Sequence, residues 1–279
     1  MEQTYVQRGY LHEDFRLFHL CGPMEEPVDW HYHTFHKIIA FLGGESAYGV
    51  EGRRYLLRPG DLVLVPQGCI HRPEAAPDAP YERRILYISP EFLRRSSTPD
   101  CQLELCFERV RESFAFVLRP READWTVLPA MLEQVLREDG FGRELLAQSL
   151  FFQFLIGLSR SMAEDAPRYA DPAAYDEKIE AILRYLTEHL TEPVSIDALA
   201  GQFFISKYHM MRQFRAQTGY TIHGYLSSKR LMRARELIAG GMPVLQAGEE
   251  SGFGDYSAFL RAYRKQFGRT PNQEKPGRP

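Results

Sequence analysis

Apolar residues in the C-terminal part of the chain recur at the spacing of short amphipathic helices. Met210 and Phe214 lie four residues apart, and Phe259 and Tyr263 repeat that spacing. Residues four apart lie one above the other on an α-helix, so each pair defines one apolar face. The pattern predicts two similar helices, each with a buried stripe.

The two helices belong to a pattern that the chain contains twice, with every position recurring at the same interval. The first copy comprises Ser206, Met210, Arg212, Phe214, Gly219 and Thr221, and the second comprises Asp255, Phe259, Arg261, Tyr263, Gly268 and Thr270. Only two copies exist, so the repeat indicates a duplicated unit and not a solenoid.

Each copy has residues that suit the two ends of a helix. Ser206 and Asp255 fit the N-cap, where a short oxygen-bearing side chain accepts from the free amides of the first turn. Gly219 and Gly268 fit the left-handed conformation in which many helices end.

A shorter helical segment precedes each of these helices, at 195–202 and 244–250, followed by a brief turn at 203–205 or 251–254. Two helices joined by a tight turn form a helix-turn-helix, whose second helix can enter the major groove of DNA. A duplicated helical hairpin without nucleic acid would have the same spacing, so spacing alone leaves both interpretations open.

Short apolar or alternating runs predict β-strands before residue 90. The runs are 15–19, 38–42, 49–57, 62–65 and 85–88, the third with a hairpin turn at Glu51-Gly52. Many short strands separated by Gly and Pro turns are typical of a barrel or sandwich.

Two strongly apolar helical segments, 125–139 and 145–162, follow the strands. Such faces must be buried, either on the barrel or against a second copy of the chain. The stretch 164–173 contains charges and two prolines and is expected to be a linker, after which a helix begins near Ala173.

These patterns together predict an α+β protein of two domains. We expect an N-terminal domain at 1–163, with a barrel at about 5–90 and helices at about 90–163. After the linker, residues 174–275 are expected to form an all-α domain with two helix-turn-helix units.

The charge distribution favours nucleic acid as the partner of the C-terminal domain. Residues 174–279 contain 15 Lys and Arg against 11 Asp and Glu, and the rest of the chain contains 19 against 26. A basic end on a chain whose net charge is −3 is expected of a DNA-binding module.

Five linked motifs carry a resemblance to a known family. They are Ile196-x2-Leu199-Ala200, Ser206-x3-Met210-x-Arg212-x-Phe214, Arg230-Leu231-x2-Ala234, Gly252-Phe253-x-Asp255-x3-Phe259-x-Arg261-x-Tyr263 and Gly268-x-Thr270-Pro271. In this order they resemble the AraC-type transcriptional regulators. The resemblance implies sequence-specific binding to double-stranded promoter DNA by two recognition helices, placed in successive grooves about 34 Å apart. It also implies a homodimer, and RNA polymerase as a further partner.

The chain departs from the family pattern at two places. Ala247-Gly248 replaces the usual Ile-Ala before the second turn, and a glycine inside a helix costs roughly 1 kcal/mol relative to alanine. The second unit is therefore expected to be looser than the first. Glu274 replaces a tyrosine that usually follows the Gly-x-Thr-Pro motif.

Residues off the apolar faces of the two helices are the candidates for DNA contact. Those predicted to contact bases are Tyr208, Met211, Arg212, Tyr256, Ser257 and Arg261, with Leu260 beside them. Those predicted to contact phosphates are Lys207, Arg215, Arg264 and Lys265. An arginine can bind guanine with two hydrogen bonds, whereas phosphate contacts position the protein without specifying a sequence. Arg230 and Arg233, on the joining helix, are expected to form structural ion pairs.

The N-terminal part resembles the cupin barrels in two motifs. Gly60-x5-Pro66-x-Gly68-x2-His71 is similar to the second cupin motif, and His31-x-His33 followed by Gly43-Gly44 is similar to the first. Many AraC-type regulators carry a cupin-like effector domain ahead of the DNA-binding part, so the two resemblances agree. They imply that residues 1–163 form a cupin-like effector-binding and dimerisation domain, and that a long helix, here about 221–239, joins the two helix-turn-helix units.

His31, His33, Lys37 and His71 are the predicted effector-binding residues. Imidazoles and a lysine can bind hydroxyls or a carboxylate, so the effector is expected to be a small molecule such as a sugar or a carboxylate. Three imidazoles would also suit zinc, which leaves a metal-sensing regulator as an alternative. No metal is predicted, because Lys37 and Ala75 occupy positions where metal-binding cupins have an acid and sometimes an asparagine. Histidines bonded only to the backbone are the third interpretation.

No catalytic residue and no cofactor are predicted. A cupin enzyme fused to a DNA-binding domain would need a complete metal-ligand set, and the chain has no Ser/His/Asp order or phosphate loop. The cysteines at 21, 69, 101 and 106 lack zinc-motif spacing, so we expect reduced thiols. The chain has neither a long apolar run nor a signal-peptide pattern at Met1-Glu2-Gln3-Thr4. A cytoplasmic protein without a membrane partner is therefore expected.

Overall fold

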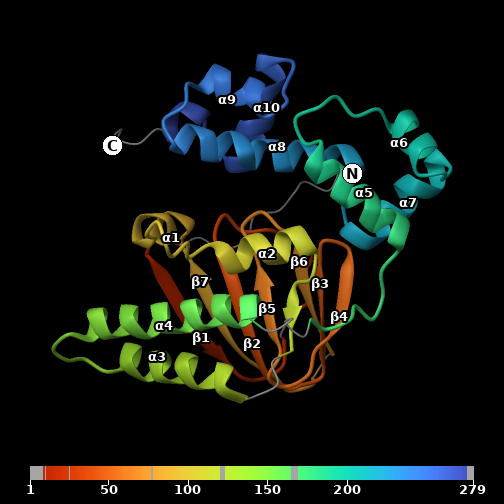
Figure 1. Cartoon of the computed structure of the whole chain (residues 1–279). Helices are drawn as coiled ribbons and strands as arrows, with labels where there is room; N and C mark the ends of the chain where they lie inside the picture. The colour runs from red at the N-terminus through yellow and green to blue at the C-terminus, as the bar shows by residue number, and fades with distance from the viewer. Residues whose placement is uncertain are drawn as a thin grey trace.

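The computed structural model describes residues 9, 11–24, 26–76, 78–119, 123–164 and 169–274. In the N-terminal part, two antiparallel sheets lie against each other (Figure 1). The first has the order β1-β7-β2-β5-β8 and comprises β1 (Phe15–Leu20), β2 (His36–Gly44), β5 (Leu62–Val65), β7 (Tyr81–Ile88) and β8 (Val117–Leu118). The second has the order β4-β3-β6 and comprises β3 (Ser46–Val50), β4 (Arg53–Leu56) and β6 (His71–Ala75). The barrel-like part is thus divided between two sheets in the described residues.

The register of β2 and β7 determines which side chains face the interior. Lys37 pairs with Tyr87, and Ile39 pairs with Ile85. Because side chains alternate along a strand, these residues face the second sheet, while Ile38 on β2 faces the opposite side. Alternate positions along β2 therefore contribute side chains to two different layers.

The predicted hairpin turn at Glu51-Gly52 is confirmed and divides the expected strand 49–57 into β3 and β4. Both residues have positive φ, 45° and 79°. Two-residue hairpin turns of this kind match the twist of the flanking strands, and a glycine at the second position suits the left-handed backbone.

Helices follow the strands and cover the outer face of the first sheet. They are α1 (Pro90–Ser96), α2 (Leu105–Ser113), η1 (Ala123–Thr126), α3 (Val127–Arg137) and α4 (Arg143–Glu164). The α3–α4 hairpin packs Pro129, Leu132 and Phe154 against Ile38 and Leu86 of the sheet. The predicted apolar helices at 125–139 and 145–162 are confirmed, and part of their apolar surface is buried on the sheet.

The C-terminal part is helical, as expected. It comprises α5 (Glu177–Glu188), α6 (Ile196–Gln202), α7 (Lys207–Thr218), α8 (Ile222–Ala239), α9 (Val244–Glu250), α10 (Tyr256–Phe267) and η2 (Pro271–Glu274). Ser206 accepts from the amide of His209, and Asp255 accepts from the amide of Ala258. Gly219 and Gly268 have φ of 78° and 70°. The predicted caps of both recognition helices, α7 and α10, are therefore confirmed.

The expectation that a helix begins near Ala173 is wrong, because α5 begins at Glu177 behind the N-cap Asp176. Ala173 donates a backbone hydrogen bond to Arg54, and Arg54 donates one to Ala174. Ala170 similarly donates to Val117. The end of the expected linker is therefore paired with the N-terminal sheets, while its residues 165–168 lie outside the described residues.

Packing explains the glycine at Gly248, and the looser second unit stays a prediction. A Cβ added at Gly248 would lie 3.0 Å from the ring of Phe259, which is fully buried. The glycine therefore lets α10 pack closely on α9. Glu274 lies in η2.

The two helix-turn-helix units pack differently on the rest of the molecule. The buried side chains of α5, α6 and α7 form one continuous apolar cluster with the two sheets. Those of α9 and α10 form a separate cluster with Leu231, Ala234 and Ile238 of α8. Figure 1 shows α8 lying between the sheets and the pair α9–α10. The first unit is therefore docked on the N-terminal domain, and the second is held through α8.

Candidate DNA-binding surface and ligand cavity

The recognition helices bury their apolar faces and expose the residues predicted to contact DNA. Met210, Phe214, Phe259 and Tyr263 are fully buried. The predicted base-contacting residues are exposed at the surface: Tyr208, Met211, Arg212, Tyr256, Ser257 and Arg261. The predicted phosphate-contacting residues are also exposed: Lys207, Arg215, Arg264 and Lys265. These ten side chains are therefore exposed to solvent, while Leu260 is partly buried, and their contacts with DNA remain predictions.

Two of these cations already have partners on the first unit. The Arg212 guanidinium lies over the ring of Tyr208, 5.8 Å from its centroid, and 3.4 Å from Nδ1 of His209. Lys207 forms an ion pair with Asp197 of α6 at 2.9 Å. Exposed pairs of this kind contribute little stability, so Lys207 can exchange Asp197 for a phosphate at small cost.

The prediction that Arg230 and Arg233 form ion pairs is wrong for the described contacts. Arg230 donates to the carbonyls of Leu190 and Glu192, and Arg233 donates to the carbonyl of Glu250. These carbonyls lie just beyond the end of α5 and at the end of α9, where helices leave acceptors unsatisfied. Both arginines therefore hold α8 against the ends of neighbouring helices.

The predicted effector-binding residues meet at a cavity of about 230 Å³ between the two sheets. His31, His33 and Lys37 line it, together with residues that the sequence pattern did not single out: Met24, Val28, Ile39, Tyr48, Pro73, Tyr81, Arg83, Ile85 and Tyr87. His71 packs behind His31, with 4.3 Å between the ring centroids. The cavity thus combines a polar end with apolar walls.

Lys37 occupies an unusual electrostatic position in this cavity. Its Nζ donates to the hydroxyl of Tyr48 at 3.3 Å and lies 5.8 Å from the ring centroid of Tyr87. Burial, with a smaller contribution from the nearby Arg83, lowers the pKa of Lys37 to about 7. Burial also raises the pKa of Tyr48 well above its ordinary value, so that hydroxyl stays protonated.

The histidines are oriented by backbone carbonyls. Nδ1 of His31 lies 2.8 Å from the carbonyl of Asp29, and Nδ1 of His71 lies 2.9 Å from that of Cys69. Each Nδ1 must therefore donate its proton, which leaves Nε2 as an acceptor. Burial, reinforced by His31, Lys37 and His33, lowers the pKa of His71 well below its ordinary value. His71 is consequently neutral at pH 7.

The three imidazoles are close enough together to hold a metal ion, with candidate ligand atoms that all lie within 4.8 Å of one another. Zinc has nitrogen ligands at about 2.0–2.1 Å, so small movements of the rings would complete such a set. Lys37 and Arg83, which face the neighbouring cavity, would however repel a divalent cation. That no metal binds here remains a prediction.

Alternation along β7 places Arg83, Ile85 and Tyr87 on the cavity side. That alternation is readable in the sequence, but the pairing of β7 with β2 is not, because the strands are far apart along the chain. The tyrosines and Arg83 were therefore missed.

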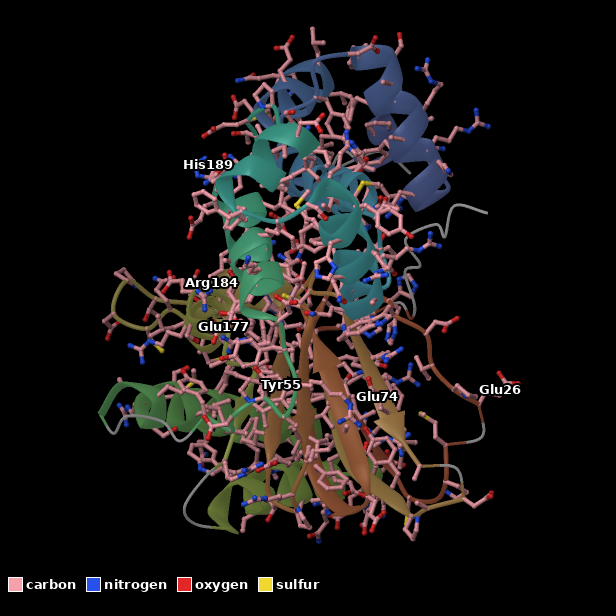
Figure 2. The ribbon with its side chains drawn as sticks, turned by 90° about the vertical axis from the view of Figure 1, so that its right-hand side faces the viewer. Glu26, Tyr55, Glu74, Glu177, Arg184 and His189 are labelled. Atoms are coloured by element: carbon pink, nitrogen blue, oxygen red, sulfur yellow. The ribbon has the colours of Figure 1, made fainter. Side chains whose placement is uncertain are left out.

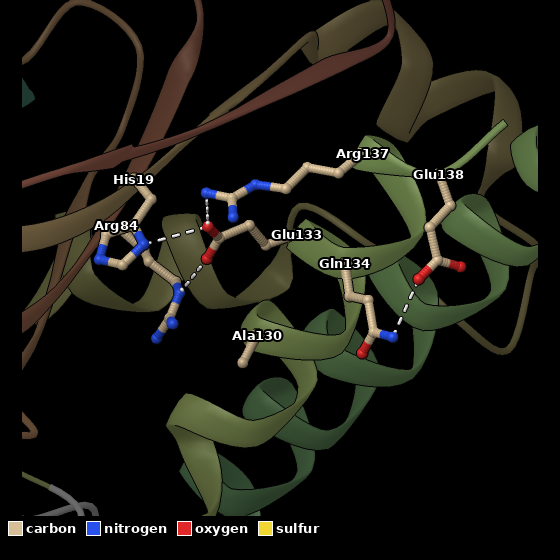
Figure 3. A pocket seen from close by; sticks show the side chains of 7 residues that line it. All are labelled: His19, Arg84, Ala130, Glu133, Gln134, Arg137 and Glu138. Atoms are coloured by element: carbon tan, nitrogen blue, oxygen red, sulfur yellow. Dashed lines mark hydrogen bonds and ion pairs between the residues drawn. The ribbon is translucent and has the colours of Figure 1, made fainter.

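A second, open pocket of about 420 Å³ lies between α3 and the outer side of β1 and β7 (Figure 3). Glu133 of α3 lies at its centre and receives His19 at 3.0 Å, Arg84 at 2.8 Å and Arg137. Burial alone would raise the pKa of Glu133, but hydrogen bonds from Arg84 and His19 outweigh burial and lower it. The carboxylate of Glu133 is therefore paired with the basic side chains that line this pocket, and these interactions attach α3 to the sheet.

The two domains meet through polar contacts as well as the shared apolar cluster. Arg184 of α5, labelled in Figure 2, donates to the carbonyls of Glu112 and Ser113. Arg53 of β4 forms an ion pair with Glu180 of α5 at 2.7 Å. Each of these contacts joins a helix of the C-terminal domain to the N-terminal domain.

A double-sheet domain with a ligand-sized cavity, joined to two helix-turn-helix units with exposed recognition helices, defines a DNA-binding transcription regulator with a ligand-binding domain. Residues 14–155 match the family model described as the AraC-like ligand binding domain, and residues 199–275 match a helix-turn-helix domain. The chain belongs to the AraC family of transcription regulators.

The chain is also similar to several known proteins. The chain is 28% identical over 266 residues to the HTH-type transcriptional activator RhaS of Salmonella typhimurium, covering 89% of this chain and 87% of the relative. It is 27% identical over 266 residues to RhaS of Salmonella heidelberg, with the same coverage. Among solved structures, ToxT of Vibrio cholerae matches 95% of this chain and 99% of its own at 14% identity, with a TM-score of 0.39. The DNA-binding domain of AdpA in complex with a target DNA matches 35% of this chain at 24% identity and covers 89% of its own chain, with a TM-score of 0.34.

No helix in the described part of the chain has the length and apolar character needed to cross a membrane.

Proposed function

We propose that a small molecule bound in the cavity between the sheets controls how the two recognition helices engage promoter DNA. The observation that carries this proposal concerns one loop, residues 66–71, which is hydrogen-bonded both to the histidine segment that lines the cavity and to α8. Since α8 connects the two helix-turn-helix units, a change in this loop can alter their placement.

On the cavity side, the loop is bonded to the histidine segment. The amide of Gly68 donates to the carbonyl of His33 at 2.8 Å. His31 and His71 exchange two backbone hydrogen bonds, at 3.1 and 2.9 Å. A ligand that displaces these histidines must therefore also displace the loop.

On the other side, the loop meets α8 through Glu51 and Lys229. Glu51 is 3% exposed and accepts from the amide of Ile70, from the hydroxyl of Tyr225 and from Nζ of Lys229 at 2.7 Å. Lys229 also donates to the carbonyl of Gly68 at 2.9 Å. Removing one partner of a buried ion pair leaves an uncompensated charge and strongly destabilises the protein. The pair Glu51–Lys229 therefore favours the domain arrangement in which both partners meet.

The neighbouring contacts extend the same junction along α8. Gln67 donates to Glu236 at 2.9 Å. A Cβ on Gly68 would lie 2.6 Å from Sδ of Met232, so Gly68 has the close approach that only glycine permits. A ligand shifts this junction only if its affinity differs between domain arrangements.

We assign base contacts to Arg212 and Arg261, which occupy equivalent exposed positions on the two recognition helices. DNA selected from a random library by the full-length protein should contain two conserved blocks about one helical turn apart. Arg212→Ala should relax the preference at one base of the first block, by roughly 1–3 kcal/mol of discrimination, and leave the second block unchanged. An unchanged base preference would remove Arg212 from the readout, and failure to enrich any sequence would overturn the proposed function.

We propose that Lys207, Arg215, Arg264 and Lys265 contact phosphates. Their replacement should weaken binding to all sequences and reduce its salt dependence, because phosphate contacts release counterions. Arg235→Met serves as the control, because it removes a cation from α8, outside the recognition helices, and should leave DNA affinity unchanged. If affinity for unrelated DNA is unchanged in the phosphate variants, the assignment is wrong.

Coupling between the domains can be tested without a known ligand, because coupling between two sites is reciprocal. Binding of the selected DNA should change amide hydrogen exchange in residues 66–71, although this loop lies outside the recognition helices. Lys229→Met should reduce that change. Identical exchange in the loop with and without DNA would show that the domains act independently.

We further propose a homodimer formed through the exposed side of the α3–α4 hairpin. Six large apolar residues lie exposed there: Val127, Met131, Leu136, Phe141, Leu145 and Leu146. Exposed apolar residues that gather on one helical hairpin favour an interaction site there. Leu145→Glu should produce a monomer in sedimentation experiments, and persistence of the dimer would exclude this surface.

The relatives are transcription regulators, and we propose that the cavity binds its ligand without transforming it. We place the protein in the cytoplasm, together with its promoter DNA. We also propose that its N-terminal domain spans residues 1–163, its linker 164–173 and its DNA-binding domain 174–275. RNA polymerase remains a predicted partner to which we assign no surface.

A further inference from the structure

The cavity is lined by cations and hydroxyl groups, and none of the described residues that line it carries a carboxylate. We propose that its ligand is a small organic monocarboxylate with a compact apolar or aromatic body, bound between Lys37 and Arg83. This inference rests on the proposed function, because it names the class of molecule that the same cavity takes.

Lys37 is buried and Arg83 is partly buried, and no ion pair with an acid is formed by either of them among the described residues. By contrast, Arg84 is paired with Glu133, and Arg119 with Asp61. Two like charges that face one cavity repel each other, and this repulsion adds to burial in lowering the pKa of Lys37. A ligand carboxylate between them would remove this repulsion.

Arg83 is held in a geometry that suits a planar anion. Its guanidinium carbon lies 3.9 Å from the ring centroid of Tyr81, and one terminal nitrogen donates to the carbonyl of Tyr81 at 2.7 Å. The remaining donors of a fixed guanidinium match the two oxygens of a carboxylate. Lys37, which donates to Tyr48, adds a second cation from the neighbouring strand.

The same lining argues against a neutral sugar. A sugar would leave both cations without a counter-charge, and its hydroxyls need acceptors as well as donors. The acceptors on the lining are the Nε2 atom of His31 and the tyrosine hydroxyls, and none of them carries a negative charge. They can bind hydroxyls of a ligand, but they leave the charges of Lys37 and Arg83 uncompensated.

The walls and the size of the cavity limit the rest of the ligand. Met24, Val28, Ile39, Pro73 and Ile85 are apolar. The volume of about 230 Å³ lies below the range of roughly 300–1,000 Å³ that is usual for drug-sized ligands. A single ring or a short alkyl chain therefore fits better than an extended molecule.

The test uses the full-length protein and a panel of carboxylates, each with its neutral amide. Benzoate, phenylacetate and the straight-chain acids from butyrate to octanoate are compared with their amides, with glucose and with zinc chloride, by thermal shift and titration calorimetry. At least one carboxylate should bind at millimolar concentration or below, and its amide should bind at least about tenfold more weakly.

Variants connect the binding to the two cations. Lys37→Met and Arg83→Met should each weaken carboxylate binding by about tenfold or more, because each removes a charge-assisted hydrogen bond. Arg58→Met removes an exposed cation from the same domain and should leave binding unchanged. Circular dichroism and the unchanged binding of selected DNA show that each variant is folded.

Every outcome decides the question. The inference is wrong if no carboxylate binds better than its amide, if glucose or zinc alone binds, or if both cation variants bind as the unchanged protein does. The proposed function fails separately, if a carboxylate binds in this way but changes neither the affinity for selected DNA nor hydrogen exchange in residues 66–71.

Discussion

Lys37 shows how one residue can favour ligand binding at the expense of stability. It is 6% exposed and has a hydroxyl, not a carboxylate, as its described hydrogen-bond partner. Its ammonium group is therefore poorly solvated in the folded protein, which is why its folded-state pKa is about 7. Buried charges without counter-ions are generally found at functional sites.

The lowered pKa of Lys37 predicts a particular dependence of stability on pH. The unfolded chain retains the ordinary pKa of 10.5, so between pH 7 and 10.5 it binds a proton that the folded protein lacks. Stability must therefore rise with pH across this window. Below about pH 7 Lys37 is charged in both states, and the full penalty of a few kcal/mol is present.

The variant Lys37→Met isolates this effect. It should be more stable than the unchanged protein at pH 7, and the difference should shrink as the pH approaches 10.5. Urea unfolding at several pH values measures it. A constant difference across the window would show that Lys37 has an ordinary pKa in the folded state.

The residues of the cavity show what could and could not be predicted from the sequence. His31, His33 and Lys37 were predicted because they resemble a local motif, and the structure brings them together. Arg83 and Tyr48 come from other strands, and their placement depends on strand register. Register follows from long-range pairing, which local patterns do not specify.

At the scale of elements, most helices and strands follow from local periodicity and caps. The duplicated pattern predicts both recognition helices together with their N-caps and glycine ends. The start of α5 was predicted too early, because Ala173 and Ala174 pair with Arg54 of β4 instead of extending the helix. A tertiary contact overrides helix propensity there.

Gly248 provides a test of packing against propensity within one helix. Helix propensity alone predicts that Gly248→Ala stabilises α9 by roughly 1 kcal/mol. The fully buried ring of Phe259 has three atoms within 3.3 Å of the added Cβ, so we expect the substitution to destabilise the second unit instead.

Gly201 in α6 is the matched control, because a Cβ there meets no atom within 4 Å. Gly201→Ala should raise the free energy of unfolding, by at most roughly 1 kcal/mol, while Gly248→Ala should lower it. Denaturant unfolding of both variants measures the sign of each change in the free energy of unfolding. Equal stabilisation would mean that Phe259 moves aside without cost.

At the scale of the whole molecule, the duplicated units differ in their packing: in the described part of the chain, the first shares an apolar cluster with the N-terminal sheets and the second belongs to a separate cluster. The indole of Trp30 lies against Gly219 at the end of α7, and its backbone carbonyl accepts from Tyr220 at 2.7 Å. At the equivalent Gly268, at the end of α10, an added Cβ would meet nothing within 4 Å. The duplication therefore supplies an internal comparison, with one helix end at the domain junction and one outside it.

We predict that Gly219→Ala loosens the junction and that Gly268→Ala does not. Both glycines have similar positive φ, so both substitutions carry the same backbone strain of roughly 1–2 kcal/mol. At Gly219 alone, the new Cβ would lie 2.5 Å from the ring of Trp30 and force the indole or α7 to move. The difference between the variants therefore measures docking of the first unit separately from strain in its helix end.

Fluorescence of Trp30, recorded with Trp125→Phe to remove the other tryptophan, reports this junction directly. Gly219→Ala should shift the emission to longer wavelength as the indole meets water, and Gly268→Ala should leave it unchanged. If loop 66–71 couples the cavity to α8, Gly219→Ala should also weaken the effect of DNA on hydrogen exchange in that loop, because a first unit released from the sheets no longer transmits its position. A shifted emission with unaltered coupling would locate the communication in Glu51 and Lys229 alone, and identical spectra for both variants would show that Trp30 does not hold the two domains together.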